Sequence, residues 1–129
     1  MKKLVFAVLV MGLVLSACSA PAGGSGATAA VEDYLSALVG QDSDRISTLS
    51  CADWEETALL ELDSFQGVTA RVDAPACAET GKDGDATLVT CQGKIIATYN
   101  NEDQELPLNT RVYKVVEEGG DWRVCGYQE

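Results

Sequence analysis

The sequence predicts an α+β fold in which N-terminal helices pack on a curved, four-stranded antiparallel sheet. Apolar residues recur at helical spacing up to about residue 66, and from Gly67 onward they recur at every second position. Short turn signals separate the alternating segments, which is typical of strands joined as hairpins. With 129 residues, the chain has the length of one small domain, since domains commonly contain about 100–150 residues.

Residues 1–17 have the features of a bacterial signal peptide. Two lysines precede an apolar run at residues 4–15. This run is too short to cross a membrane, because a spanning helix needs about 20 apolar residues. The run ends in Leu-Ser-Ala-Cys at residues 15–18, and this ending resembles the lipobox of bacterial lipoproteins. The alternative is an ordinary secretory signal that is cleaved near Ala17 or Ala20.

The lipobox resemblance implies that the signal peptide is removed and that Cys18 carries acyl chains such as palmitate. It places the protein outside the cytoplasm, lipid-anchored to the cell membrane or to an outer membrane. In a cell with two membranes, Ser19 after the cysteine would favour the outer membrane. Loss of the two leader lysines leaves seven basic and twenty acidic side chains, a net charge of −13 over residues 18–129. Anionic head groups repel such a domain, so the lipid must hold it at the membrane.

Residues 18–28 are predicted to be the lipidated cysteine followed by a flexible linker, and residues 29–129 the folded domain. The linker is rich in Gly, Ser and Ala and has no charged side chain. Gly/Ser-rich chains behave as flexible coils. This composition fits either a spacer that lifts the domain off the membrane or an ordinary disordered terminus.

Three helices are predicted at the start of the domain. The first presents one apolar stripe at helical spacing, formed by Val31, Tyr34, Leu35, Leu38 and Val39. Thr28 is its candidate N-cap. A second, short helix is capped by Asp42 or Ser43, and a third begins at Asp53, which forms a capping-box pattern with Glu56.

Four strands are predicted after the helices, at residues 68–73, 86–99, 106–117 and 122–127. Pro75 either ends the first strand or places it at an edge or a bulge. Turns are predicted at residues 81–85 and 100–103.

The last two strands form a hairpin if Gly119-Gly120 is a two-residue turn. That turn places Val116 opposite Arg123. It also places Val112 opposite Tyr127.

Two segments of the predicted domain resemble small lipoproteins of the NTF2-like superfamily. They are Tyr-Leu-Ser-Ala-Leu at residues 34–38 and Trp-Arg-Val-Cys at residues 122–125. The resemblance covers about residues 29–128 and implies a cone-shaped α+β domain whose concave sheet face often forms a pocket. The superfamily contains ketosteroid isomerases and many non-enzymatic modules, so the fold leaves the function open.

Four cysteines remain when Cys18 is assigned to lipid, and an even number in an exported domain predicts two disulfides. We favour Cys77–Cys91, because the two residues lie symmetrically about the turn at Gly84, together with Cys51–Cys125. A metal site or a redox dithiol is the rival interpretation, but the chain has no Cys-x-x-Cys motif and no histidine.

The pairing of Cys77 with Cys91 creates a conflict in register. Regular pairing would place Arg71 opposite Ala97, which sets a polar strand face against an apolar one. It would likewise place Asp73 opposite Ile95. Either a bulge shifts the register, or the disulfide prediction is wrong.

The composition excludes several classes of function. The absence of histidine removes the commonest general base and metal ligand. Nine basic residues against twenty acids argue against a nucleic-acid partner. No Gly-rich loop leads from a strand into a helix, and the acidic clusters at residues 42–44 and 83–85 lack EF-hand spacing and are predicted to be cap and turn residues. We therefore expect no metal and no cofactor.

A pocket is predicted in preference to a catalytic site, with Trp54, Tyr99, Arg111 and Tyr113 as the candidate ligand contacts. Each of these residues could instead belong to the core or the sheet surface. An acid/base enzyme of the ketosteroid isomerase type would need a carboxylate near an oxyanion-holding tyrosine or protonated acid. No spacing in the sequence singles out such a pair.

The sequence thus predicts a membrane-anchored extracytoplasmic lipoprotein whose domain binds an envelope protein or a small apolar ligand without being an enzyme. The alternatives are a small acid/base enzyme and a purely structural envelope protein. A deep pocket with a converging carboxylate and tyrosine would favour the enzyme. A filled cone with an exposed apolar patch would favour a protein partner, and a closed core without either feature would favour the structural role.

Overall fold

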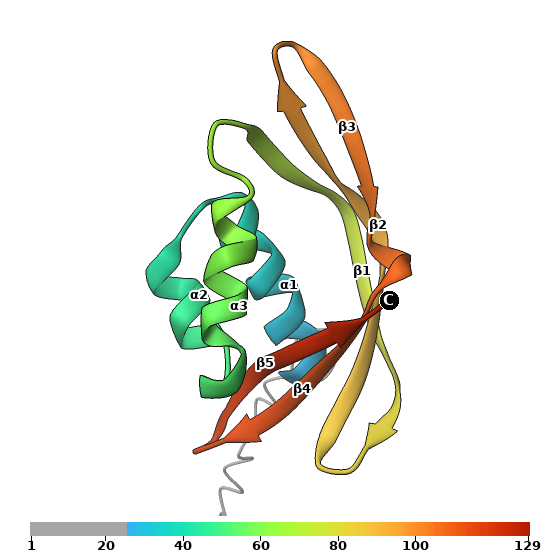
Figure 1. The fold of residues 1–129 in the computed structure, drawn as a ribbon. Coiled ribbons are helices and arrows are strands. Elements are labelled where there is room, and N and C mark those ends of the chain that lie inside the picture. The colour runs from blue at the N-terminus through green and yellow to red at the C-terminus, as the bar shows by residue number, and fades with distance from the viewer. Residues whose placement is uncertain (1–25) are drawn as a thin grey trace, which may run out of the picture.

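The computed structural model describes residues 26–129. The predicted signal peptide, Cys18 and residues 19–25 of the predicted linker lie outside the described residues. The elements follow the order α1 (Gly26–Val39), α2 (Ser43–Leu49), α3 (Ala52–Asp63), β1 (Thr69–Asp83), β2 (Ala86–Tyr99), β3 (Glu102–Pro107), the 3-10 turn η1 (Leu108–Thr110), β4 (Val112–Glu118) and β5 (Asp121–Gln128). The three helices lie together on one side of the sheet (Figure 1), which confirms the predicted α+β arrangement.

Helix α1 includes residues that the sequence assigned to the flexible linker. Thr28 lies inside the helix and is 3% exposed, so its prediction as the N-cap is wrong. The reason is close packing: a Cβ at Gly26 would overlap the indole of Trp122 on β5. The small side chains at the start of α1 therefore let the helix lie directly against the sheet, and the folded part extends to Gly26 at least.

The predicted starts of the other two helices are partly correct. Asp42 caps α2, and its carboxylate accepts a hydrogen bond from the Arg45 backbone N–H at 3.1 Å. Helix α3 begins at Ala52 and its N-cap is Cys51, so the predicted capping box led by Asp53 is wrong. The Cys51 N–H donates to the Val124 carbonyl of β5 at 3.0 Å, and this contact with the sheet fixes where α3 starts.

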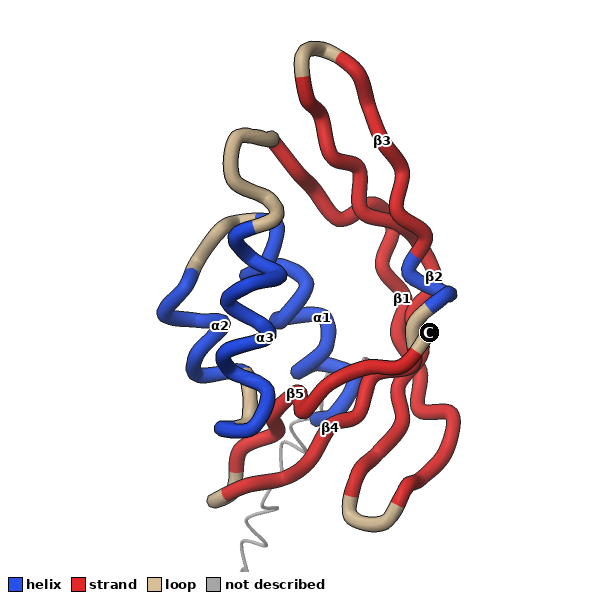
Figure 2. Tube along the Cα trace, viewed as in Figure 1, coloured by secondary structure: helices blue, strands red, loops and turns tan. Residues whose placement is uncertain are grey.

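The sheet has five strands rather than the predicted four, with β1, β2, β4 and β5 in order and β3 paired to β2. The predicted strand at 106–117 is interrupted by η1. Pro107 has no N–H for a ladder, and Leu108 turns inward to a site where it is 2% exposed. As a result β2 pairs with β3 over residues 94–99 and with β4 over residues 87–90. In Figure 2, β4 and β5 turn from β1 and β2 toward the helices.

A β-bulge resolves the register conflict around the first disulfide. The register shifts between Asp73 and Ala76, so that Val72 lies opposite Ile95 while Cys77 lies opposite Cys91. Two residues of β1 face Gly93 alone, and Ala74 adopts a positive φ of 47° there. Gly93 itself is at φ 97°, and a Cβ on it would lie 2.6 Å from backbone oxygens of the bulge. The extra residue keeps the apolar faces of both strands aligned.

The β4–β5 hairpin also contains a bulge, between Tyr113 and Val115. Val116 pairs with Arg123, as predicted. Beyond the bulge, however, Tyr127 pairs with Tyr113, so the predicted pairing of Tyr127 with Val112 is wrong. Cross-strand partners share a face of the sheet, and the bulge therefore places both tyrosines on the same side.

Both predicted disulfides are present. Cys51 and Cys125 have Cα atoms 5.2 Å apart, and the Cα atoms of Cys77 and Cys91 are 4.0 Å apart. The first bond ties the start of α3 to β5 and the second closes the β1–β2 hairpin. Disulfides persist in oxidising compartments, which indicates an extracytoplasmic protein. Within residues 26–129, no helix has the length and apolar character needed to span a membrane.

The hydrophobic core lies between the helices and the sheet. Its fully buried members come from all three helices and from β2, β4 and β5, and include Val31, Leu35, Leu38, Ile46, Ala58, Val89, Val115 and Val124. At the C-terminal end of α3 the packing becomes polar, and there the interior holds charged and phenolic side chains.

Candidate functional site

A largely buried carboxylate lies at the end of the core near the C-terminus of α3. Glu61 projects from α3 on the same side as Ala58 and Leu62, and its side chain is 12% exposed. Arg111 Nη1 donates to Oε1 at 2.6 Å, and the Tyr127 hydroxyl donates to the same oxygen at 3.3 Å. The Tyr34 hydroxyl donates to Oε2 at 2.9 Å. Both oxygens of this carboxylate are therefore engaged, by donors from three different elements.

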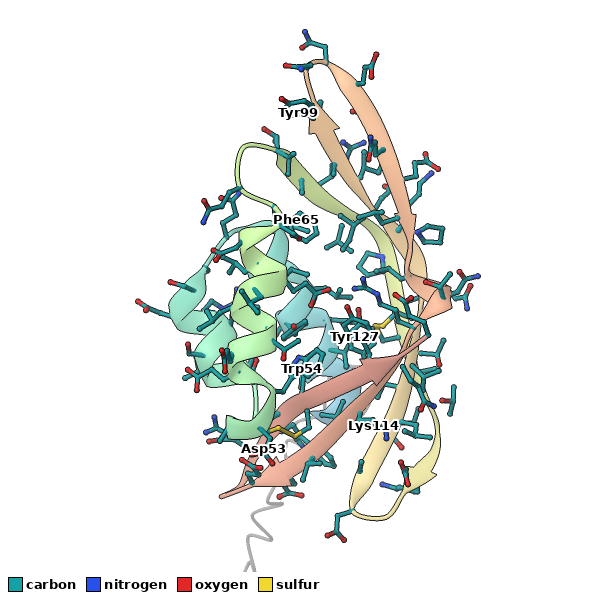
Figure 3. The ribbon with its side chains drawn as sticks, viewed as in Figure 1. Asp53, Trp54, Phe65, Tyr99, Lys114 and Tyr127 are labelled. Atoms are coloured by element: carbon teal, nitrogen blue, oxygen red, sulfur yellow. A yellow bond between two sulfur atoms is a disulfide. The ribbon has the colours of Figure 1, made fainter. Side chains whose placement is uncertain are left out.

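Aromatic rings enclose this carboxylate. Trp54 donates its indole N–H to the Tyr34 hydroxyl at 3.3 Å. Tyr113 packs edge-on against both Tyr34 and Tyr127, with ring centroids 6.4 Å and 5.5 Å apart. Trp54 and Tyr127 also meet edge-on at 5.5 Å (Figure 3). We call Tyr34, Trp54, Glu61, Arg111, Tyr113 and Tyr127 the Glu61 cluster.

Arg111 connects the cluster to the sheet. It is the C-cap of η1, and its backbone N–H donates to the Leu108 carbonyl at 3.2 Å. The guanidinium carbon lies 4.1 Å from the Tyr127 ring centroid, a cation–π contact. Burial alone would lower the pKa of Arg111, but the Tyr113 oxygen and the Glu61 carboxylate raise it on balance. The guanidinium therefore stays charged.

Burial keeps the tyrosines of the cluster protonated. It raises the pKa of Tyr113 to about 12, although the nearby Arg111 opposes the shift. Burial and the negative charge of Glu61 also raise the pKa of Tyr34 and, to a smaller extent, that of Tyr127. At neutral pH all three are phenols, which can donate hydrogen bonds to an anion.

One hydroxyl of the cluster has no partner. Tyr113 is fully buried, and its hydroxyl makes no hydrogen bond of acceptable geometry among residues 26–129. Arg111 lies beside it, and the guanidinium N–H groups near the phenolic oxygen lower the pKa of Tyr113. The hydroxyl hydrogen is the part that has no acceptor within residues 26–129. Buried hydroxyls nearly always find a partner, so this one is an unused donor.

A small pocket adjoins the cluster and shares Arg111 with it. Its volume is about 150 Å³, and it is lined by Phe65, Ile95, Leu106, Pro107, Leu108, Thr110, Arg111 and Glu129. The walls are mainly apolar, and the guanidinium of Arg111 is the cationic group among them. Arg111 Nε also lies 3.5 Å from Oε1 of Glu129. The pocket thus lies where the end of α3 faces β2, β3 and η1.

The structure brings together three of the four predicted contact residues. Trp54, Arg111 and Tyr113 belong to the Glu61 cluster, and Arg111 also lines the pocket. Tyr99 lies apart from them at the tip of the β2–β3 hairpin, where it is 59% exposed (Figure 3). Its prediction as a ligand contact is not supported, because the turn after β2 carries it away from the helices.

Sequence reasoning missed Glu61, Tyr34 and Tyr127. Glu61 lies in the apolar stripe of α3 together with Trp54, Ala58 and Leu62. An acid in such a stripe is a signal that could have been noticed, because burying a carboxylate requires partners. Tyr34 and Tyr127 are among the tyrosines of the sequence, but no spacing paired either of them with an acid.

One further group of potential metal ligands consists of Cys51, Cys125 and Glu118, whose ligand atoms lie within 4.8 Å of one another. The two sulfurs are bonded to each other, so they are not available as thiolates. The exposed Glu118 then remains as a single carboxylate.

Comparisons with known proteins identify the fold. No protein-family profile and no curated protein matches the sequence. Among solved structures, the chain is similar to a candidate ketosteroid isomerase from Shewanella frigidimarina, with a TM-score of 0.54 and 14% identity over 80% of this chain and 93% of that one. It is also similar to a SEC-C motif protein from Rhodopseudomonas palustris, with a TM-score of 0.53 and 12% identity over 81% and 80%.

A third similar structure is an epoxide hydrolase of the LEH-like type from M. tuberculosis, with a TM-score of 0.49 and 19% identity over 80% and 83%. The likeness to the candidate ketosteroid isomerase, with its TM-score of 0.54, confirms the expected NTF2-like fold. At such identities a likeness shows the fold alone, and the activity of each neighbour belongs to that protein.

The ion pair of the cluster should contribute more to stability than an exposed pair of equal length. Glu61→Gln leaves the largely buried Arg111 with only the exposed Glu129 carboxylate as a counter-charge, and we expect the free energy of unfolding to fall by about 2–3 kcal/mol. The matched control is Glu105→Gln, because Lys94 and Glu105 also lie 2.6 Å apart but on the surface. Water screens that pair. Urea unfolding should show a much smaller loss for the control, and equal losses would contradict the role of the cluster.

The buried tyrosines predict a loss of stability at alkaline pH. Above pH 10, the ordinary pKa of tyrosine, the unfolded chain releases phenolic protons that the folded chain keeps. Stability is therefore complete below pH 10 and falls as pH rises, by roughly 2 kcal/mol at pH 12 for Tyr113 alone. Urea unfolding of Tyr113→Phe should show a flatter profile than the wild type. Tyr99→Phe, outside the cluster, is the control, and equal profiles for both variants would refute the assignment.

Proposed function

We propose that this protein is an extracytoplasmic lipoprotein, anchored in a membrane through a lipidated Cys18, whose NTF2-like domain binds a small apolar ligand without catalysis. The observation that carries the proposal is the pocket of about 150 Å³ with apolar walls, beside an interior already filled by the Glu61 cluster. An engineered cavity of this volume in another protein binds benzene. The pocket therefore suits a single ring or a short aliphatic chain.

The arrangement of Glu61 argues against a general base. Its oxygens accept hydrogen bonds from Arg111, Tyr34 and Tyr127. A general base must reach the proton that it removes with a free lone pair, whereas this carboxylate is turned toward its own ion pair. The pocket is also smaller than the roughly 300–1,000 Å³ typical of sites for drug-sized molecules.

The likeness to a candidate ketosteroid isomerase keeps an acid/base enzyme as the second candidate. The specific observation in its favour is that a carboxylate and tyrosines do converge inside the cone, at Glu61, Tyr34 and Tyr127. Such a reaction would require Glu61 to leave Arg111 and a substrate to enter a space larger than the pocket. The filled interior therefore favours binding over catalysis.

The extracytoplasmic location is supported by two independent features. The disulfides Cys51–Cys125 and Cys77–Cys91 indicate an oxidising compartment. The lipobox resemblance at residues 15–18 implies export and a lipid anchor. The start of α1 lies beside the β4–β5 hairpin, at the end of the domain opposite Tyr99 (Figures 1 and 3). A tether joined to Gly26 would thus place the β4–β5 hairpin toward the membrane and the β2–β3 hairpin away from it.

Lipid anchoring is tested by mass spectrometry of the mature N-terminus and by cell fractionation. We expect an acylated Cys18 as the first residue, with the protein in the membrane fraction. Cys18→Ser should move the protein to the soluble fraction, and its two disulfides should still form. A mature N-terminus without lipid would contradict the anchor and favour an ordinary secretory signal.

Ligand binding is tested with benzamide, a neutral single-ring probe, in a ¹H–¹⁵N NMR titration. We expect shifts of the Leu108 and Thr110 amides, because both residues line the pocket. Leu106→Trp should fill the pocket and abolish these shifts. Leu60→Trp is the control, since Leu60 is 64% exposed on α3 and does not line the pocket. Shifts that persist in Leu106→Trp, or no shifts in the wild type, would contradict the proposed site.

A further inference from the structure

We infer that the ligand carries a carboxylate, that Arg111 recognises it, and that the side chain of Glu129 holds the same position when the ligand is absent. This inference rests on the proposed function, because it specifies the chemical class bound in the same pocket. It is drawn from the geometry of the Arg111 guanidinium and its neighbours.

Arg111 has unused capacity on the side facing the pocket. A guanidinium offers five N–H donors in a planar fork. Nη1 donates to Glu61, while the face of the group lies over the Tyr127 ring. The side chain remains 25% exposed and forms part of the pocket wall. The inner part of the fork is therefore fixed by the cluster, and the outer part can bind a second anion in a constant orientation.

A carboxylate already lies near that outer part. Oε1 of Glu129 is 3.5 Å from Arg111 Nε, and the Glu129 side chain lines the pocket although it is 69% exposed. This distance exceeds the 2.7–2.9 Å of a strong charge-assisted hydrogen bond. An exposed ion pair of this kind contributes little free energy, so a ligand carboxylate can replace Glu129. The exchange leaves the number of charges around Arg111 unchanged.

The size and walls of the pocket limit the rest of the ligand. Apolar side chains of Phe65, Ile95, Leu106 and Leu108 face a volume of about 150 Å³, enough for one aromatic ring. The domain is strongly acidic overall, so its long-range field repels anions. Recognition of a carboxylate must therefore come from the local contact with Arg111. Monocyclic aromatic acids and short-chain fatty acids meet these requirements.

The test compares benzoate with benzamide on the unmodified domain at pH 7, by NMR titration that includes the Arg111 Nε–H signal. The two probes share the ring and differ in charge. We expect benzoate to bind about tenfold more tightly, because hydrogen bonds to charged groups are stronger than neutral ones. Equal affinities would overturn the carboxylate assignment while leaving the apolar pocket intact. If neither probe binds, the proposed ligand site itself is wrong.

A second measurement isolates Glu129. Glu129→Gln removes the competing carboxylate, and we expect benzoate to bind about two- to fivefold more tightly. Glu118→Gln is the matched control: it removes the same charge from an exposed position near Arg123, outside the pocket. A gain confined to Glu129→Gln supports the exchange. Equal gains in both variants would show an effect of net charge alone and would refute the role of Glu129.

Discussion

The ion pair between Glu61 and Arg111 is the interaction on which the interior of this domain depends. It joins α3 to the sheet across 50 positions of sequence, at 2.6 Å and largely shielded from water. Buried charges are costly unless they are paired and hydrogen-bonded. The phenols of Tyr34 and Tyr127 donate further hydrogen bonds to the carboxylate, and the Tyr127 ring covers the guanidinium. The polar cluster thus replaces apolar packing at this end of the core.

Irregularities in the sheet place the members of this cluster. The turn η1 interrupts what would otherwise be one strand and presents Arg111 toward α3. The bulge after Tyr113 puts Tyr127 on the same face of the sheet. Gly126, which lies against the Trp54 indole, has a φ of 130°, a backbone conformation that favours glycine. Regular strands would have dispersed these side chains over two faces.

The features of the fold that depend on local patterns could be predicted from the sequence. The period change near Gly67 separated helices from strands, the symmetry about Gly84 indicated Cys77–Cys91, and the conflict at Arg71 together with Pro75 indicated a bulge. Contacts between elements that are distant in the sequence could not be predicted in this way. Thr28 was taken as a cap because Trp122, which packs on the start of α1, lies far away in sequence. Glu61 went unnoticed because its partners come from three separate elements.

The Glu61 cluster is thus a structural part of the interior, and ligand binding is proposed for the small pocket beside it. The most direct test is a double-mutant cycle with Glu61→Gln, Arg111→Gln and the double variant, measured by urea unfolding. Arg111→Gln leaves the Glu61 carboxylate without a counter-charge, and Glu61→Gln leaves Arg111 with only the exposed Glu129. The double variant should therefore lose less stability than the sum of the single variants, by about 2 kcal/mol or more. Additive losses would show that the two charges do not support each other and would contradict the central claim.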